Sequence, residues 1–579
     1  MRRIVAGAAA VTVGLGGSLM VAPALAESAA PEVEAAKSAG PKVRWDWSMP
    51  PGMVDEKTWN RVDDPSSPHY IDGGYFTDGP DGMPDQFMKS VKGYSAAGKA
   101  RYGKLPKNDL HKVYLDASGS TGTGSLKCSW TIETDVLVKR KNKNCDKQLA
   151  VKLPNGKYPL SLKVTDSTGT TTVDSKIHVK NILIGIIGDS YGSGEGFPPF
   201  TRAGFGGATR ELHWDEAACN RSHWSGFVRS AQTVENADHR SNVTLLDVAC
   251  AGAQVSKSEI PGRTAGGIIS PQPVSYTHEG GTKTGLQPPQ TDQLRAIVGD
   301  RPFDNVLLSI GGNDVGFSPI SKACLLEGQG DNCYSKPAPW APGEDLWVAI
   351  DHLLLELEKR YARMAPCVSS TGGNKACKTF KITGGDSVAD KRTKSKPVVL
   401  RKSSKLLHAM YPDLTTTTNA QGDIVPCYQD GLLPQSPMNQ ISNSWAWDAA
   451  YQGEPGKPIT LPTIYSPPLP TPDPAVITPS AYGLAKQVVQ NQGDYGWTPG
   501  LSMLAASRGH GLCATDEPWL YGIRTALTAS NPANQSGAEH PNDDGQTAYA
   551  DMMGPMAEDL TGVPVNKPKT VVRSHQGLG

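Results

Sequence analysis

The chain has 579 residues, with 57 basic and 57 acidic side chains and 38% hydrophobic residues. This length allows several domains of roughly 150 residues each and a large buried core. Its zero formal net charge argues against nucleic acid or an anionic membrane surface as the main partner, because both select basic protein faces.

Residues 1–26 have the pattern of an export signal. A positive start (Arg2 and Arg3) precedes an apolar stretch over residues 4–21 that is rich in Ala, Gly and Val. Residues 24–26 then form an A-x-A cleavage site. A membrane anchor is the alternative, but glycines interrupt the stretch and the cleavage site follows it. We therefore expect a secreted, extracellular protein without stable membrane insertion.

The cysteines agree with an oxidising compartment. Their number, 10, is even and no C-x-x-C occurs, which favours disulfides over zinc or redox chemistry. The gaps between cysteines suggest local pairs, although spacing leaves the connectivity open. These pairs are Cys128 with Cys145, Cys219 with Cys250, Cys324 with Cys333, Cys367 with Cys377, and Cys427 with Cys513.

Residues 27–107 carry no clear periodicity. Up to about residue 43 the segment is rich in Ala, Glu, Pro and Lys, which is typical of a disordered tether. Gly, Pro and Asp are frequent in the remainder. We treat 27–107 as a leader or linker of uncertain structure, the alternative being an extension that packs on the next unit.

Residues 108–180 have the pattern of a small all-β unit. Short β-type runs separated by turn clusters predict a sandwich; they lie at 113–115, 130–132, 160–164 and 170–179. The sequence LDASGS at 115–120, with GKY and VTD further on, resembles the PKD-type Ig-like repeat. That resemblance implies contact with a polysaccharide or another surface; a passive spacer is the alternative.

From residue 181 the pattern becomes α/β. Continuous apolar strands are predicted at 182–187, 243–248, 305–310 and 405–410, and helices at 224–237, 291–298 and 346–364. Their alternation predicts a parallel sheet covered by helices on both faces. Two stretches look inserted, a basic one near 366–404 and a proline-rich one near 429–480.

The first of these strands ends in the loop GDSYGSGEG at 188–196. Ligands bind beyond the carboxyl ends of parallel strands, so Ser190 is placed as a nucleophile, and the glycines permit a tight turn that leaves its hydroxyl uncovered. A phosphate-binding loop would need Gly-Lys-Ser/Thr where this chain has Glu195. A G-x-S-x-G elbow matches formally, and so does the GDS block of the SGNH (GDSL-type) hydrolases.

Further blocks follow in the order that the SGNH family shows. The sequence ACAGA at 249–253 follows the second strand, and SIGGND at 309–314 follows the third. His-Pro-Asn at 540–542 precedes a helical run over 546–560. Together with the serine loop, these blocks resemble the family over about 181–565. An α/β-hydrolase is disfavoured, because in that fold several strands precede the elbow.

The resemblance implies a three-layer α/β/α hydrolase domain over 181–579 that cleaves carboxylic esters through an acyl-enzyme. Ser190 is then the nucleophile and His540 its general base, because a serine hydroxyl attacks poorly until a base takes its proton. The backbone N–H groups of Ser190 and Gly252 and the side-chain amide of Asn313 would form the oxyanion hole. No metal or organic cofactor is expected, since H-E-x-x-H is absent and the histidines are scattered.

One position departs from the family pattern. The family usually carries an aspartate three residues before the histidine, where this chain has Gly537. Either a backbone carbonyl orients the ring, which makes a Ser–His dyad, or a carboxylate from elsewhere does so, with Asp516 and Glu517 as candidates. We favour the carbonyl, because a neutral acceptor also fixes the imidazole tautomer.

The surrounding residues resemble those of secreted actinobacterial lipases and esterases of this family. The sequences CNRS at 219–222 and HGLC at 510–513 carry this likeness. In those relatives three disulfides pin the loops around the site, and the pairs 219–250, 324–333 and 427–513 would match them. The expected substrate is a lipid ester or an acylated carbohydrate. An acetyl-polysaccharide esterase and a non-catalytic binding protein on a hydrolase scaffold remain alternatives. Asp189 and Asp314 are expected to make structural hydrogen bonds.

Overall fold

The computed structural model describes residues 40–50, 52, 91–94, 100–102, 110–134, 138–142, 144–196, 218–222, 224–258, 266–278, 281–321, 337–369, 377–384, 387–401, 406–414, 416–426, 484–512, 514, 517–521 and 539–562. The predicted export signal, the proline-rich insert at 429–480 and the cysteine pairs 324–333 and 427–513 lie outside these ranges. Within them, no helix is both long and apolar enough to cross a bilayer.

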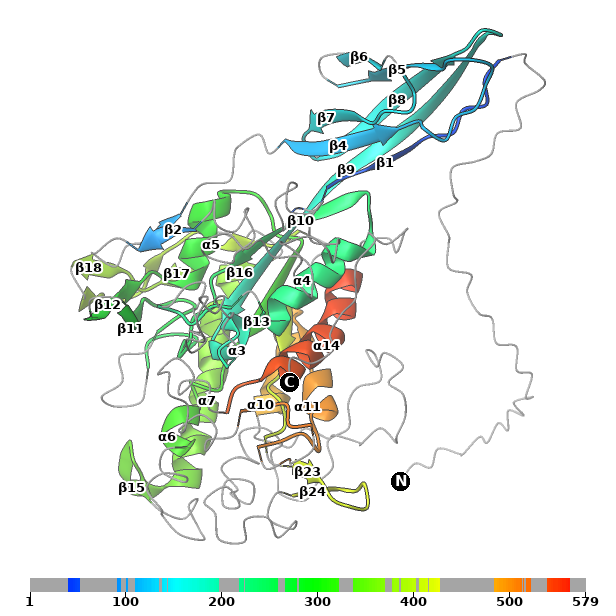
Figure 1. The fold of residues 1–579 in the computed structure, drawn as a ribbon. Coiled ribbons are helices and arrows are strands. Elements are labelled where there is room, and N and C mark those ends of the chain that lie inside the picture. Colours follow the sequence, from blue (N-terminus) through cyan, green and yellow to red (C-terminus); the bar gives the residue numbers. More distant parts are fainter. Residues whose placement is uncertain are drawn as a thin grey trace, which may run out of the picture.

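The chain has a mixed α/β fold built on a mixed eight-stranded sheet (Figure 1). The parallel part runs β25 (Thr498–Gly500), β22 (Leu406–Ala409), β13 (Asn305–Ser309), β9 (Thr170–Gly188), with β10 (Ser241–Asp247) also paired to β9. The antiparallel part continues from β9 to β8 (Gly156–Thr165), β5 (Lys127–Ile132) and β6 (Val138–Asn142). The strands predicted at 182–187, 243–248, 305–310 and 405–410 are thereby confirmed, with small differences at their ends.

Strand β9 belongs to both parts of the sheet. Residues 170–179 pair antiparallel with β8, and residues 184–188 pair parallel with β13. Side chains alternate between exposed and half-buried at the start of the strand, whereas every residue from Asn181 to Gly188 is buried. This change shows that the first half of β9 has one solvent-exposed face, whereas the second half is covered on both faces. The predicted boundary between residues 180 and 181 therefore falls inside one unbroken strand.

A smaller three-stranded antiparallel sheet packs beside the antiparallel part. It consists of β1 (Asp46–Ser48), β4 (His111–Asp116) and β7 (Leu149–Leu153). Both sheets contribute to one apolar core that includes Trp47, Leu115, Trp130 and Leu162, and the predicted disulfide Cys128–Cys145 is formed there. The predicted short strands of this β unit are confirmed, whereas its kinship with Ig-like repeats stays a prediction. Strand β1 comes from the segment that the sequence leaves unassigned.

The same leader segment also contacts the α/β part. The carboxylate of Asp46 accepts hydrogen bonds from Arg240 at 2.7 Å and lies 3.3 Å from His239 Nε2. Burial opposes its charge, but the bonds from His239 and Arg240 hold the pKa of Asp46 well below its ordinary value. Further along, the backbone N–H of Gly52 donates to the carboxylate of Glu235 at 3.1 Å. The leader thus fastens the two parts at a second place besides β9.

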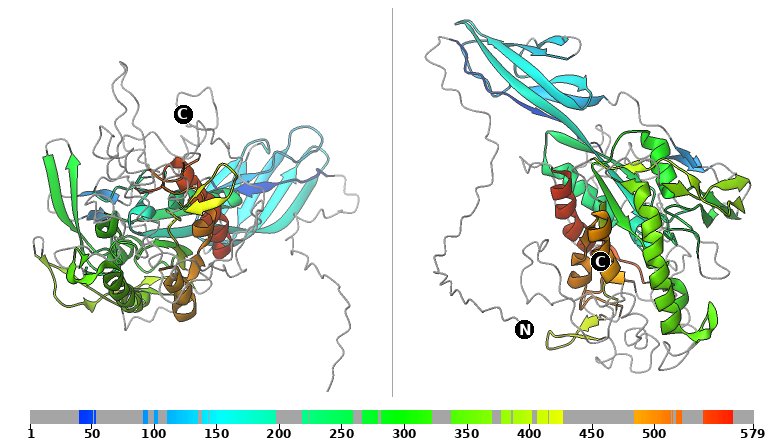
Figure 2. Two further views of the ribbon diagram at one scale, coloured as in Figure 1. Left: turned by 90° about the horizontal axis from the view of Figure 1, so that it is seen from below. Right: turned by 180° about the vertical axis from the view of Figure 1, so that it is seen from behind.

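Helices flank the parallel strands. Figures 1 and 2 show α4 (Gly226–Ala237) and α14 (Asp543–Thr561) together on one side, with α5 (Gln290–Val298) and α7 (Leu346–Met364) on the other. Each confirms a predicted helix, and α7 has the predicted bounds. Their buried side chains, with those of the parallel strands, form the larger of the two main cores.

The remaining elements are short or were not predicted. They are β2 (Val91–Tyr94), β3 (Ala100–Tyr102), α3 (Ser190–Ser193), β11 (Gln272–His278), β12 (Gly281–Gln287), α6 (Phe317–Ser321), β14 (Pro337–Ala338), β15 (Ala341–Asp345), η3 (Ala365–Cys367), β16 (Val368–Ser369), β17 (Lys378–Thr379), β18 (Ile382–Gly384), β19 (Ser387–Val388), β20 (Thr393–Lys394), β21 (Val398–Val399), β23 (Thr416–Thr418), β24 (Ile424–Pro426), α10 (Leu484–Tyr495) and α11 (Ser502–Ala506). The predicted insert at 366–404 holds β16 to β21 and the disulfide Cys367–Cys377.

Candidate active site

Ser190 stands at a sharp turn between β9 and the short helix α3. Gly188, the last residue of the strand, has φ +147°, and a Cβ there would overlap the carbonyl oxygen of Ser309 on β13. The chain therefore needs glycine where the two strands come close. Asp189 then caps α3 by accepting a hydrogen bond from the N–H of Tyr191 at 3.2 Å. Ser190 is the first residue of this helix, at the carboxyl end of a parallel strand, as predicted.

The Asp189 side chain anchors this turn to the interior of the protein. Its carboxylate is fully buried and accepts hydrogen bonds from the hydroxyls of Ser309, at 2.9 Å, and Tyr411. Burial raises its pKa to about 7 in spite of these bonds. The expectation of a structural hydrogen-bonding role for Asp189 is confirmed.

His540 lies against the serine loop. The hydroxyl of Tyr191, the residue after Ser190, donates to the carbonyl of Glu539 at 2.7 Å, and the Tyr191 and His540 rings are 5.2 Å apart between centroids. At the other end of the loop, a Cβ on Gly196 would lie 2.8 Å from the Cβ of His540. The serine loop therefore contacts the histidine segment at Tyr191 and at Gly196, although the loop and the segment are far apart in sequence.

The histidine segment is also fixed from its own side. Tyr521 exchanges backbone hydrogen bonds with it, donating to the carbonyl of His540 at 3.0 Å and accepting from the N–H of Glu539 at 2.9 Å. Glu539 has φ +66°, an unusual conformation for a side chain of this size. Asn542 then caps α14 by accepting from the N–H of Gly545 at 3.0 Å. His540 is thus held between a backbone pairing and a helix start.

A carboxylate that the sequence did not single out for this role faces the histidine. Glu195 Oε2 lies 3.6 Å from His540 Nε2, and the two side chains are 9% and 10% exposed. The other carboxylate oxygen, Oε1, accepts from the side-chain amide of Asn220 at 2.7 Å. In the sequence, Glu195 stands out only as the residue that breaks a phosphate-loop pattern. Its place between two glycines of the serine loop is the signal that could have identified it.

Of the two carboxylates proposed as an acid partner of His540, only Glu517 lies within the described residues. The carbonyl oxygen of Glu517 lies 2.8 Å from Nδ1 of His510, whereas Asp516 and Gly537 lie outside the described residues. An orienting role for Asp516, Glu517 or a backbone carbonyl stays a prediction.

The loop that carries Gly252 is tied to the serine loop. The N–H of Cys250 donates to the carbonyl of Gly188 at 3.0 Å, and the predicted disulfide Cys219–Cys250 is formed. Gly252 itself is exposed with φ +75°. Within the part of the chain that the structure describes, neither Ser190 nor Gly252 has an acceptor for its backbone N–H.

Asn313 reaches the same place from the carboxyl end of β13. Its side-chain amide donates to the carbonyl of Ala253 at 3.1 Å, next to Gly252. Because an amide nitrogen carries two hydrogens, one N–H of Asn313 is left to donate elsewhere. The structure thus gathers the serine, glycine and asparagine loops at one edge of the sheet. Across the described ranges, no group of His, Cys, Asp and Glu side chains could hold a metal ion.

Comparisons with known proteins give only remote likenesses. No family model and no curated protein match the chain. It is similar to a solved carbohydrate esterase whose active site displays divergent catalytic and non-catalytic binding functions, with 12% identity and a TM-score of 0.15 over 44% of this chain and 71% of that one. It is also similar to a carbohydrate acetylesterase from Xanthomonas citri, with 10% identity and a TM-score of 0.14 over 45% of this chain and 55% of that one. An acetyl xylan esterase from the rumen bacterium Butyrivibrio proteoclasticus has 10% identity and a TM-score of 0.15 over 48% of this chain and 76% of that one. Likenesses at such TM-scores carry no argument, and the function is inferred from the residues of the site.

Proposed function

We propose that the chain is a secreted serine ester hydrolase of the SGNH type, with a three-layer α/β/α catalytic domain. The observation that carries this proposal is the meeting of the Ser190 turn and the His540 segment through Tyr191 and Gly196. A serine at the carboxyl end of a parallel strand, beside a histidine and uncommitted N–H donors, is suited to acyl transfer.

In the proposed reaction, Ser190 Oγ attacks the ester carbonyl while His540 takes the hydroxyl proton. The N–H groups of Ser190, Gly252 and Asn313 bind the negative oxygen that forms, and losing one such donor costs roughly 3–4 kcal/mol of transition-state stabilisation. The intermediate expels the alcohol, which receives the proton from His540. Water then attacks the acyl-enzyme by the same route and releases the acid.

Glu195 has a role in this scheme that follows from charge. When His540 holds the proton it is a cation, and a carboxylate within 4 Å stabilises that form. The hydrogen bond from Asn220 keeps the Glu195 carboxylate in place. We assign Glu195 as the acidic partner of His540 in place of the aspartate that the family pattern would supply at Gly537. Because Glu195 faces Nε2, Nδ1 is then the nitrogen that takes the proton from Ser190.

Labelling with a fluorophosphonate tests the proposal. We expect one label per molecule, on Ser190, lost in Ser190→Ala and strongly slowed in His540→Ala. Ser193→Ala is the matched control, because Ser193 is the other serine of α3 and its Oγ only donates to the carbonyl of Ser190; it should keep the label. A folded wild-type protein that takes no label would instead indicate a binding protein on a hydrolase scaffold.

The proposed substrate is a lipid ester or an acylated carbohydrate, with the β unit contacting a polysaccharide or another surface. A panel of esters that differ in acyl length, with phospholipid and acetylated xylan included, separates the two. Preference for long acyl chains supports a lipase, and preference for acetyl groups on xylan supports an acetyl-polysaccharide esterase. Hydrolysis of none of these esters would contradict both.

A further inference from the structure

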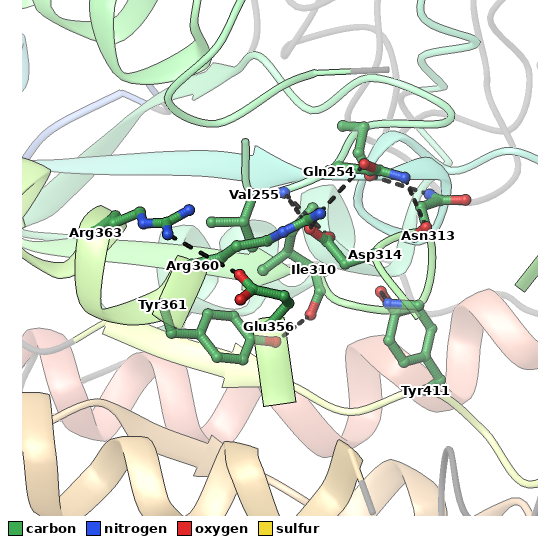
Figure 3. Close-up of polar contacts among 12 residues, drawn as sticks. Gln254, Val255, Ile310, Asn313, Asp314, Glu356, Arg360, Tyr361, Arg363 and Tyr411 are labelled. Carbon is green, nitrogen blue, oxygen red and sulfur yellow. Dashed lines mark hydrogen bonds and ion pairs between the residues drawn. The ribbon is translucent and has the colours of Figure 1, made fainter. Parts of the chain in front are cut away.

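A buried ion pair lies behind the loop that carries Asn313. Arg360, on α7, places Nη1 2.6 Å from Oδ1 of Asp314, and the side chains are 1% and 0% exposed (Figure 3). Removing two charges from water is expensive, and apolar replacements of such pairs are often equally stable or more so. The pair therefore calls for an explanation other than stability.

Asp314 connects the Asn313 loop to the Gly252 loop. Both of its carboxylate oxygens accept from the backbone N–H of Val255 at 3.1 Å. The neighbouring residue Gln254 lies 3.4 Å from Arg360 Nη1 through its side-chain oxygen. Arg360 thus touches one residue from each loop at a single nitrogen.

Asn313 is held by the same bridge. Its backbone carbonyl accepts from Gln254 Nε2 at 2.7 Å, and its side-chain amide donates to Ala253 at 3.1 Å. Figure 3 shows Asn313, Gln254, Asp314 and Arg360 side by side. Because the side chains of Gln254 and Asp314 are polar and buried, their positions are fixed by these partners.

The next residue of α7 supports the same loop from below. The hydroxyl of Tyr361 donates to the carbonyl of Ile310 at 2.9 Å, and the N–H of Gly312 donates to Tyr411 at 3.0 Å. The loop from Ile310 to Asp314 is therefore held by several specific partners, and two of them, Arg360 and Tyr361, are adjacent residues of α7.

We propose that Arg360 is a positioning residue for the oxyanion hole: by clamping Asp314 and Gln254 it sets the distance between the Gly252 N–H and the free N–H of Asn313. This inference rests on the proposed function. Arg360 acts through Asn313 and not on substrate, since its guanidinium bonds to Asp314 behind the loop. An error of about 1 Å in a catalytic group can cost on the order of 100-fold in rate.

A double-mutant cycle with Asn313→Ala tests the proposal. Arg360→Met should lower kcat about 10- to 100-fold with little change in KM, because donors displaced from the oxyanion act only in the transition state. Asn313→Ala alone should cost about 100- to 1,000-fold. If Arg360 acts through Asn313, the double variant should be no slower than Asn313→Ala, since the groups work as one unit. Multiplied losses, or full kcat in Arg360→Met, would overturn the inference.

The controls separate positioning from folding. Arg363 lies about one turn after Arg360 on α7. Its side chain is 38% exposed, and its Nη2 lies 4.0 Å from Oε2 of Glu356. The control variant Arg363→Met should therefore keep full kcat. If Arg360→Met fails to fold, Arg360→Lys takes its place in the same cycle, because lysine keeps the charge but not the planar fork. All rates are divided by the number of sites labelled by fluorophosphonate. An unlabelled wild type refutes the proposed function, whereas labelled variants with undiminished kcat refute this inference alone.

Discussion

The contact between Glu195 and His540 gives a test at the scale of one residue. We expect Glu195→Gln to lower kcat by about tenfold or more with KM nearly unchanged, since each 1.36 kcal/mol of lost transition-state stabilisation is tenfold in rate. Glu195→Asp should recover part of the loss, because it restores the charge at a greater distance. Steady-state kinetics on a soluble ester measure both.

Glu517 provides the matched comparison for Glu195. It was a candidate acid partner on sequence grounds, and Glu517→Gln and Asp516→Asn are expected to keep most of the activity. A loss of several orders of magnitude in either variant, with Glu195→Gln unaffected, would reverse the assignment.

Asp189 makes the stability of the protein depend on pH in a particular direction. Burial raises its folded-state pKa to about 7, so its contribution is fully present below its unfolded pKa of about 4 and is lost as pH rises through about 7. Asn cannot ionise, and Asp189→Asn should therefore gain stability relative to wild type as the pH rises from 4 to 8. Calorimetric Tm values across that range decide the point; parallel curves for the two proteins would contradict it.

The sequence predicts Ser190, Gly252 and Asn313 as site residues, but it does not indicate which side chains hold their loops in place. Ser190, Gly252 and Asn313 each follow a run of apolar residues, and the carboxyl ends of parallel strands meet at one edge. The sequence does not indicate that Glu195 pairs with His540 or that Arg360 pairs with Asp314, because the partners come from different elements of the fold. A local pattern does not show such tertiary pairing.

At the scale of elements, α4 and α14 pack too closely for a side chain on Gly226. A Cβ there would overlap Tyr549 and the carbonyl of Gln546 on α14. We expect Gly226→Ala to lower the free energy of unfolding by about 1–3 kcal/mol, the usual cost of overpacking. Because α14 begins just after His540, kcat should fall as well. Denaturant unfolding and steady-state kinetics measure the two effects.

Gly493 is the control for the effect of a methyl group. It lies exposed in α10, with nothing within 4 Å of an added Cβ. Gly493→Ala should be neutral or gain up to about 1 kcal/mol, because alanine favours a helix over glycine. Equal losses in both variants would show that packing between α4 and α14 is not the cause.

Elements were predictable where their burial imposes a periodicity. Helix α7 follows a clear amphipathic pattern, and β10 and β13 have apolar residues at their centres and are buried along their whole length. Strand β25 was missed because Thr-Pro-Gly is unlike a strand; its place at the outer edge of the sheet tolerates the proline. The hairpin of β11 and β12 is rich in polar residues and lacks an apolar run. It forms through backbone pairing that composition does not reveal.

For the whole molecule, β9 is the feature that decides how the two cores relate. One register pairs residues 170–179 in the β unit and residues 184–188 in the α/β part. A strand that joins the antiparallel and parallel parts of one sheet cannot shift its register in one part without losing its pairing in the other. The leader contact between Asp46 and Arg240 joins the same two parts. Both connections favour unfolding of the wild-type protein in one cooperative transition.

Inserting Gly-Ser-Gly-Ser between Val179 and Lys180 should divide that transition into two. The insertion leaves the pairing with β8 on one side and with β13 on the other, but it removes the rigid connection between them. We expect two calorimetric transitions and nearly full activity on a small soluble ester, because the catalytic loops lie beyond the insertion. The same insertion between Gly124 and Ser125, in an exposed turn of the β unit, should leave a single transition. If both insertions leave the unfolding unchanged, β9 is not what couples the two cores.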